Sequence, residues 1–217
     1  MPGILYAIPT PLGGAASDAL PASAVQTVRT LRHFVVENAK SARAFLKEAG
    51  VPCAIQELDI SVLDSDVSNH IKKLQKNISI GLLSEAGCPA IADPGAALVE
   101  AAHREGFRVV PLVGPSAITL ALMASGLEGQ RFAFCGYLPR ETEARGNRLR
   151  ELEARSRRER ETQIFIETPY RNDVMLGALL AACSPGTLLC VASDLTIRID
   201  DSGSASAGAP PSAQGMA

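Results

Sequence analysis

Acidic residues stand directly after short apolar runs of this chain, where a side chain could act on a bound molecule. Glu167 follows Ile164–Ile166 and precedes Thr-Pro, so no helix-capping role explains it. Glu37 follows the apolar run His33–Val36. Carboxylates can act as general bases or bind positive groups. We therefore predict Glu37 and Glu167 as site residues, while a plain surface ion pair of Glu37 with Lys40 or Arg43 is the alternative.

A loop of small residues follows the apolar run Ile78–Leu83. It contains two prolines and two glycines and leads into an amphipathic segment. The pattern predicts a strand, a tight loop and a helix, with Asp93 as the helix cap and Pro94 at the first helical position. A glycine such as Gly87 lets a ligand approach the backbone closely, because it has no Cβ. The simpler interpretation is a loop that only connects a strand to a helix.

Three other apolar runs end in residues of the same kind. The loops that follow them are Pro9–Gly14, Gly114–Ala117 and Glu167–Arg171. In an open α/β sheet, ligands bind beyond the carboxyl ends of the strands. Four such loops predict a single ligand crevice.

Apolar runs alternate with amphipathic segments along the chain, which predicts an α/β fold with a largely parallel sheet in the first half. The proline-rich stretch Pro111–Pro115 is the expected joint between two lobes. The expected strands are Ile4–Ile8, His33–Glu37, Ala54–Leu58, Ile78–Ser84, Phe107–Val113, Phe132–Leu138, Gln163–Glu167 and Leu188–Ser193. The expected helices include Pro21–Leu31, Ala42–Ala49, Val67–Leu74, Ala117–Ser125 and a charged segment, Arg140–Glu161, which we interpret as solvated rather than RNA-binding.

The order and spacing of these motifs resemble a known family. They look like those of the tetrapyrrole-methylase superfamily of S-adenosylmethionine-dependent methyltransferases, in the branch that methylates the ribose 2′-O of small-subunit ribosomal RNA. The similarity runs from about Gly3 to about Leu195. The motifs are Pro9–Gly13, Ser84–Gly95, Gly114–Ala117, Gly136–Pro139 and Glu167–Arg171.

The resemblance implies a two-lobed fold, with a mostly parallel sheet in the first lobe and a mixed sheet in the second. It implies S-adenosylmethionine as cofactor, no metal, and Glu37, Glu167 and Arg171 as catalytic residues on the acceptor side. The residues expected at the cofactor are Pro9, Thr10, Gly13, Ser84, Ala86, Gly87, Pro89, Ile91, Ala92, Asp93, Ser116, Ala117, Glu167 and Pro169.

Two motifs depart from the family pattern. An acidic-Asp-Thr-Arg motif of the ribosomal RNA enzymes reads Glu37–Lys40, with Asn38 and Ala39 in place of Asp and Thr. A Glu-Ser-Pro-His-Arg motif has Tyr170 in place of the histidine. These changes leave the acceptor open between ribosomal RNA and a tetrapyrrole or other small molecule. A cofactor-binding relative without turnover is the third alternative.

Composition sets further expectations. The net charge is −2 and the chain has no tryptophan, so the basic field and aromatic platforms common in nucleic-acid-binding proteins are absent. The five cysteines form no C-x-x-C pair, which favours free thiols in a reducing compartment. We see neither a signal peptide nor a membrane span and expect a cytoplasmic protein, most simply a homodimer as in the family.

The chain changes character near its C-terminus. Ser, Gly, Ala and Pro dominate from residue 202 onward, a composition with too little apolar surface to form a packed element. The expected domains are residues 1–113 for the first α/β lobe, 114–199 for a second lobe cut short, and 200–217 for a low-complexity tail.

Overall fold

The computed structural model describes residues 2–197, which fall into two compact units. The N-terminal unit contains the described residues up to Ala117 together with Thr196 and Ile197, and the C-terminal unit is Ile118–Leu195. The expected tail, residues 200–217, lies outside the described residues.

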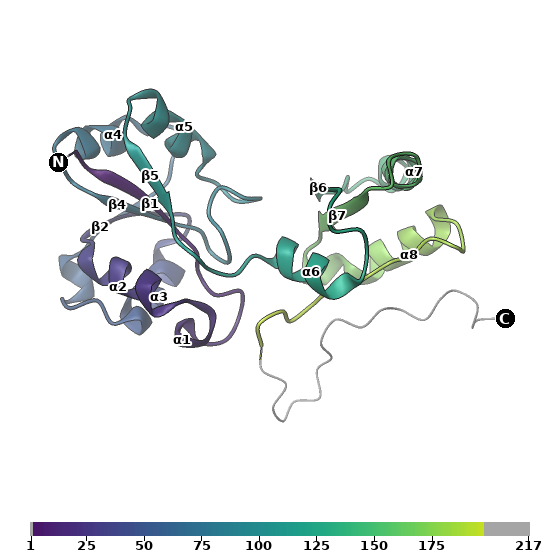
Figure 1. The fold of residues 1–217 in the computed structure, drawn as a ribbon, viewed down its shortest axis with the longest axis horizontal. Coiled ribbons are helices and arrows are strands. Elements are labelled where there is room, and N and C mark those ends of the chain that lie inside the picture. Colours follow the sequence, from purple (N-terminus) through teal and green to yellow (C-terminus); the bar gives the residue numbers. More distant parts are fainter. Residues whose placement is uncertain (1, 198–217) are drawn as a thin grey trace. The chain divides into compact units, whose positions relative to one another are not determined.

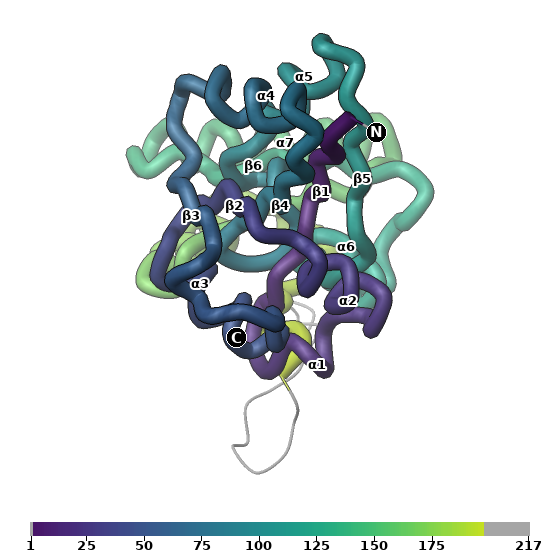
Figure 2. Tube along the Cα trace, turned by 90° about the vertical axis from the view of Figure 1, so that its left-hand side faces the viewer, coloured from purple at the N-terminus to yellow at the C-terminus, as the bar shows by residue number. Residues whose placement is uncertain are grey.

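The N-terminal unit is built on a five-stranded sheet in the order β3-β2-β4-β1-β5, in which every neighbouring pair is parallel (Figure 1). This confirms the mostly parallel sheet predicted for the first lobe. Figure 2 shows β3 and β5 at opposite edges. The strands are β1 (Ile4–Ile8), β2 (His33–Val36), β3 (Asp59–Val62), β4 (Ile80–Leu83) and β5 (Arg108–Pro111). The helices are α1 (Ala16–Ala19), α2 (Ala22–Thr30), α3 (Ala39–Ala49), η1 (Ile55–Glu57), α4 (Ser68–Gln75) and α5 (Ala96–Arg104).

Helices cover both faces of this sheet, with α2 and α3 on one side and α4 and α5 on the other (Figure 1). Successive side chains of a strand point to opposite faces, so both faces of a covered parallel sheet must be apolar. Strand β2 follows this rule, because Phe34 and Val36 belong to the core under α2 and α3 while Val35 belongs to the other core.

One predicted strand of this unit is wrong. Ala54–Leu58 was expected to be extended, but it contains the short helix η1, and the strand is Asp59–Val62. Strand β3 pairs only with β2, at the edge of the sheet. An edge strand is only partly covered, so its residues need not be uniformly apolar. The polar residues Asp59 and Ser61 interrupt the apolar pattern by which a strand is recognised in the sequence.

The C-terminal unit is smaller. Its strands β6 (Phe132–Tyr137) and β7 (Thr162–Ile166) pair in parallel, with an irregularity between Phe134 and Tyr137. The core beside them is formed by Leu138, Leu149, Leu152, Met175 and Leu179. The helices are α6 (Ala117–Ser125), α7 (Thr142–Glu159), η2 (Pro169–Arg171) and α8 (Asn172–Ala182).

The segment Leu188–Ser193, expected as a strand, forms none in the described part of the chain, so this prediction is wrong. Among residues 2–197 the second sheet contains only β6 and β7, and the antiparallel strand needed for a mixed sheet is not among them. A strand needs a neighbour for its backbone hydrogen bonds, and an apolar run without one stays irregular.

Candidate functional site

Two of the predicted loops of the N-terminal unit are joined through their backbones. Thr10 N donates to Gly87 O at 2.9 Å, and Gly87 N donates to Thr10 O at 3.0 Å. Strands β1 and β4 are neighbours, so the loops after them start side by side. Thr10 is 3% exposed, and its hydroxyl donates to the carbonyl of Ser84 at 3.4 Å. The loop after β1 is thereby fixed to the loop after β4.

The loop between β4 and α5 has an unusual backbone. Gly87 and Gly95 have φ of 75° and 132°, and Ala90 and Ala92 both have φ of 65°. A left-handed conformation costs a non-glycine residue about 1–2 kcal/mol, so two alanines in it mark a loop held in shape by its surroundings. Ser84 contributes by donating its hydroxyl to Gly87 O at 3.1 Å. Such loops are common at functional sites.

The helix after this loop begins differently from the prediction. Gly95 is the N-terminal boundary residue of α5, and no side chain caps the helix. Asp93 is therefore not its cap, and Pro94 is not its first residue. The Asp93 carboxyl lies beside the Ser84 hydroxyl, whose proton is donated to Gly87 O. The positive φ of Gly95 turns the chain into the helix two residues later than the local Asp-Pro signal suggests.

Carboxyl groups gather at the carboxyl ends of β2 and β4. Glu37 Oε2 accepts a hydrogen bond from Glu85 N at 3.0 Å, which ties the two loops together. Burial raises the pKa of the Asp93 carboxyl, the negative charges of Glu37 and Glu85 raise it further, and the nearby Ser84 hydroxyl lowers it. This edge of the sheet is therefore a site of negative potential.

Asn38, which the sequence marked only as a departure from the family motif, lies among the same polar groups. Its amide donates to Glu85 Oε1 at 3.1 Å, and its carbonyl oxygen accepts from Lys40 N at 2.9 Å as the cap of α3. An Asn before a helical pattern is a capping signal that could have found it. Among the described residues, Glu37 forms no ion pair with Lys40 or Arg43, so the alternative of a surface ion pair is wrong. Glu37 binds the Glu85 backbone instead.

The third loop, after β5, packs on the first two. A Cβ on Gly114 would overlap the ring of Pro9, so only glycine permits this close approach. Cys88 Sγ donates to Pro115 O at 3.4 Å. Ser116 and Ala117 come directly after Pro115 in the chain. In the loop after β1, Gly13 O accepts a hydrogen bond from the Thr196 hydroxyl at 3.2 Å. The structure thus brings the loops after β1, β4 and β5 together at one edge.

The remaining predicted residues, Glu167, Pro169 and Arg171, lie in the C-terminal unit after β7. Glu167 Oε1 accepts from Thr168 N at 2.8 Å, and Glu167 Oε2 lies 3.2 Å from an Arg171 guanidinium nitrogen. The side chains of Glu167 and Arg171 are 7% and 15% exposed. The contact is an ion pair without hydrogen-bond geometry. These residues therefore form a buried charged pair within their own unit.

In the part of the chain that the structure describes, no helix is both long and apolar enough to cross a membrane.

Comparison with known proteins identifies relatives of this chain. Ribosomal RNA small subunit methyltransferase I of Xylella fastidiosa (strain Temecula1) is 35% identical over 195 residues, which cover 90% of this chain and 69% of that protein. The protein of the same name from Escherichia coli O157:H7 is 32% identical over 194 residues, covering 89% and 66%. The chain thus spans about two thirds of the length of these relatives. No family model matches the chain.

Solved structures show the same fold at low identity. The crystal structure of the methyltransferase CobJ has a TM-score of 0.57 at 17% identity and covers 88% of this chain and 80% of its own. Uroporphyrin-III-C-methyltransferase from Thermus thermophilus has a TM-score of 0.50 at 17% identity, covering 87% and 78%. The predicted resemblance and α/β fold class are confirmed, and the relatives are methyltransferases by name, as the sequence predicted.

Proposed function

The chain belongs to the family of ribosomal RNA small subunit methyltransferase I, and from this membership we propose that it transfers a methyl group from S-adenosylmethionine to small-subunit ribosomal RNA, at a ribose 2′-oxygen. The observation that carries the proposal is the 35% identity over 195 residues. The geometry of the loops after β1, β4 and β5 supports it, because they meet at the sheet edge where α/β proteins bind ligands.

The N-terminal unit offers groups that suit the methyl donor. The sulfonium and amino groups of S-adenosylmethionine are positive, and Glu37, Glu85 and Asp93 supply carboxylates at one edge. Ile91 is 49% exposed on the loop between β4 and α5, an apolar contact suited to an adenosine ring. The proposed donor-binding residues of this unit are Pro9, Thr10, Gly13, Ser84, Ala86, Gly87, Pro89, Ile91, Ala92, Asp93, Ser116 and Ala117.

The bound donor supplies an electrophilic methyl group. The chain itself must hold the acceptor oxygen in line, exclude water and accept a proton. Glu37 and Glu167 already accept hydrogen bonds from backbone N–H groups. We therefore propose that both act as positioning residues, Glu37 for the loop after β4 and Glu167 for Arg171, and that Arg171 contributes positive charge on the acceptor side.

Transfer of a labelled methyl group tests the acceptor. The full chain is incubated with methyl-labelled S-adenosylmethionine and either small ribosomal subunits or a metabolite extract. We expect label in the RNA. Label in a small molecule would assign the alternative acceptor class, to which the changes at Asn38 and Tyr170 point. Donor binding without any transfer would identify a relative without turnover.

A pair of glycine variants tests the donor site. Gly87 and Gly106 both have φ of 75°, so Gly87→Leu and Gly106→Leu impose the same backbone strain. A Cβ on Gly87 would lie 3.0 Å from Leu12 and 3.7 Å from Pro115 O, whereas nothing lies within 4 Å of one on Gly106. Calorimetric titration should show loss of S-adenosylmethionine binding in Gly87→Leu alone. Unchanged affinity in Gly87→Leu would remove this loop from the donor site.

We also propose a homodimer in the cytoplasm, where ribosomes lie. The support is the apolar surface of the C-terminal unit, since no residue of α6 is buried and Met123 is 80% exposed. On α8, Leu180 is 72% exposed. Where exposed apolar side chains form a patch, the patch commonly marks an interface.

A further inference from the structure

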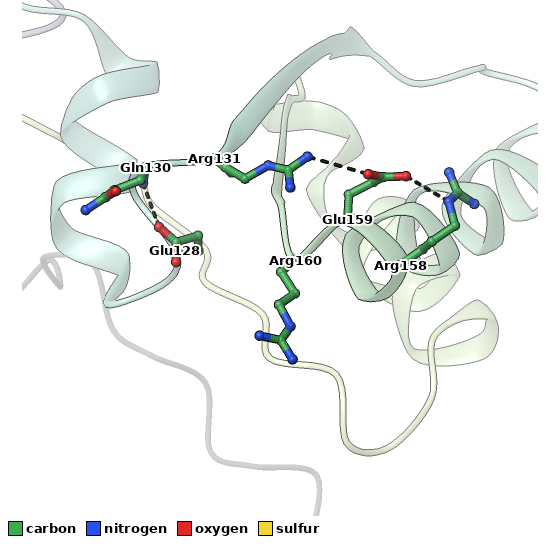
Figure 3. Close-up of a pocket in the computed structure, with 6 residues that line it drawn as sticks. All are labelled: Glu128, Gln130, Arg131, Arg158, Glu159 and Arg160. Carbon is green, nitrogen blue, oxygen red and sulfur yellow. Dashed lines mark hydrogen bonds and ion pairs between the residues drawn. The ribbon is translucent and has the colours of Figure 1, made fainter.

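A pocket rich in arginine lies in the C-terminal unit, and none of its residues belongs to the loops described for the N-terminal unit. It is an open depression of about 360 Å³ beside the end of α7 and the start of β6 (Figure 3). Its lining residues are Glu128, Gln130, Arg131, Arg158, Glu159 and Arg160. With three arginines against two glutamates, the pocket carries a net positive charge.

The carboxylates of Glu128 and Glu159 do not fully neutralise the three guanidinium groups of this pocket. Glu159 is shared, because its carboxylate lies 2.8 Å from Arg158 and 3.5 Å from Arg131, and Figure 3 shows it between the two guanidinium groups. The Glu128 carboxylate accepts a hydrogen bond from the backbone N–H of Gln130 at 2.7 Å. Among the described residues, Arg160 has no ion-pair partner, and its side chain extends away from Glu159 (Figure 3).

Three other arginines of α7 each pair with a glutamate. Arg148 pairs with Glu151, Arg155 with Glu161 and Arg157 with Glu153. A helix C-terminus attracts cations through its dipole, which accounts for arginines in the last turn of α7. It does not account for Arg131, which directly precedes β6 and adds positive charge at the same place.

The backbone at Arg160 gives a second, independent observation. Arg160 ends α7 with φ of 50° and ψ of 54°, the left-handed conformation in which glycine is favoured. An arginine there has a backbone cost that glycine would avoid. Its guanidinium is exposed, and no carboxylate of residues 2–197 forms an ion pair with it to offset this cost. Strain of this kind is often found at ligand sites.

We propose that this pocket binds a phosphodiester group of the RNA acceptor, with Arg160 as the main contact and Arg131 and Arg158 in support. Guanidinium groups bind phosphate oxygens through paired hydrogen bonds, and Arg160 has its full donor capacity available. The inference rests on the proposed function. It specifies how a chain with a net charge of −2 binds RNA, through a local basic pocket rather than through a positive electrostatic field of the whole protein.

The test is equilibrium binding of the full chain to purified small-subunit ribosomal RNA at several salt concentrations. Arg160→Gly removes the guanidinium and suits the backbone, so its melting temperature should stay equal or rise by about 2–4 °C. Its RNA affinity should fall about tenfold, and the slope of log affinity against log salt should decrease by about one. Arg160→Glu should weaken binding further.

Arg150→Glu is the matched control. Arg150 lies on the same helix, donates to Asn147 and has no carboxylate partner among the described residues, so the change in net charge equals that of Arg160→Glu. We expect it to leave RNA affinity within about twofold of the unmodified chain. Unchanged affinity in both Arg160 variants, or equal losses in Arg150→Glu and Arg160→Glu, would overturn the pocket assignment.

The outcome is separable from that of the proposed function. Methyl transfer to ribosomal subunits, with RNA binding unaffected at Arg160, would leave the function standing and remove the inference. Failure of the unmodified chain to bind RNA even at low salt would overturn both. Binding of S-adenosylmethionine should be the same in all variants, because Arg131, Arg158 and Arg160 are not among the proposed donor-binding residues.

Discussion

The two units of this protein bury very different amounts of apolar surface. In the N-terminal unit, a five-stranded sheet is covered on both faces, and residues such as Leu5, Ile8 and Leu82 are 0% exposed. In the C-terminal unit, a two-stranded sheet and two helices enclose five buried apolar residues. An isolated pair of strands is only marginally stable, so the second unit depends on α7 and α8 for its core.

The exposed apolar residues show the same contrast. Helix α6 has the sequence AITLALMAS, in which no residue is buried, and Leu188 in the same unit is 76% exposed. In the N-terminal unit, the apolar faces of α2 to α5 are directed into the two cores. The N-terminal unit therefore buries most of its apolar helix faces, whereas the C-terminal unit leaves more of its large apolar side chains exposed.

The largest expected difference comes from truncating one core leucine in each unit. Leu82→Ala should cost about 3–4 kcal/mol, since Leu82 lies in a sheet packed from both sides. Leu149→Ala should cost about 2 kcal/mol, because the smaller core around it can collapse more easily. Urea denaturation with hydrogen exchange measures both. Equal costs would contradict the difference between the cores.

The second-largest expected difference is between the stability costs of replacing the two predicted acidic site residues, Glu167 and Glu37. Glu167→Gln leaves the Arg171 guanidinium, 15% exposed, without its carboxylate and should cost about 1–3 kcal/mol. Glu37→Gln keeps an oxygen that can accept from Glu85 N, so we expect about 0.5 kcal/mol or less. Thermal denaturation of both variants checks this. An Arg171→Met, Glu167→Gln double variant with additive costs would show that the pair is not coupled.

Surface lysines test whether the apolar surface of the C-terminal unit forms an interface. Met123→Lys and Leu180→Lys should each weaken self-association by about tenfold or more, because a charge would be buried. Val62→Lys is the control, since Val62 is 53% exposed on the edge strand of the N-terminal unit. Light scattering over a dilution series gives the oligomeric state. A monomer at every concentration would refute the dimer.

The smallest effects concern pH and should have opposite signs in the two units. Burial raises the pKa of Asp93, so its ionisation costs stability as pH rises through that folded-state pKa. Hydrogen bonds from the Ala144 and Glu143 N–H groups lower the pKa of Glu141, so it stabilises α7 above its unfolded pKa and loses this effect as pH falls.

The matched variants are Asp93→Asn and Glu141→Gln. Relative to the unmodified chain, Asp93→Asn should become more stable at pH 7 than at pH 3, and Glu141→Gln should become less stable at pH 7 than at pH 3. Melting temperatures across this pH range measure both. A pH-independent difference for either variant would mean that its carboxyl titrates as in the unfolded chain.

Local signals in the sequence predicted most of the fold. Strand β1 and helix α6 have the expected bounds, and α2 differs by one residue at each end. Apolar periodicity and the positions of glycine and proline are properties of neighbouring residues, so they can be read without the fold. The prediction failed at Ala54–Leu58 and Leu188–Ser193, where strand formation depends on a partner that the local sequence does not specify.

The sequence by itself determined that apolar strands end in loops of Gly, Pro and small residues, and that acidic residues follow two of these strands. Only the tertiary structure decided what those residues contact. Glu37 accepts from Glu85 N, 48 residues away, and Thr10 joins Gly87 because β1 and β4 are neighbours in the sheet. Such contacts depend on strand order, which is set by packing of the whole sheet rather than by any short segment.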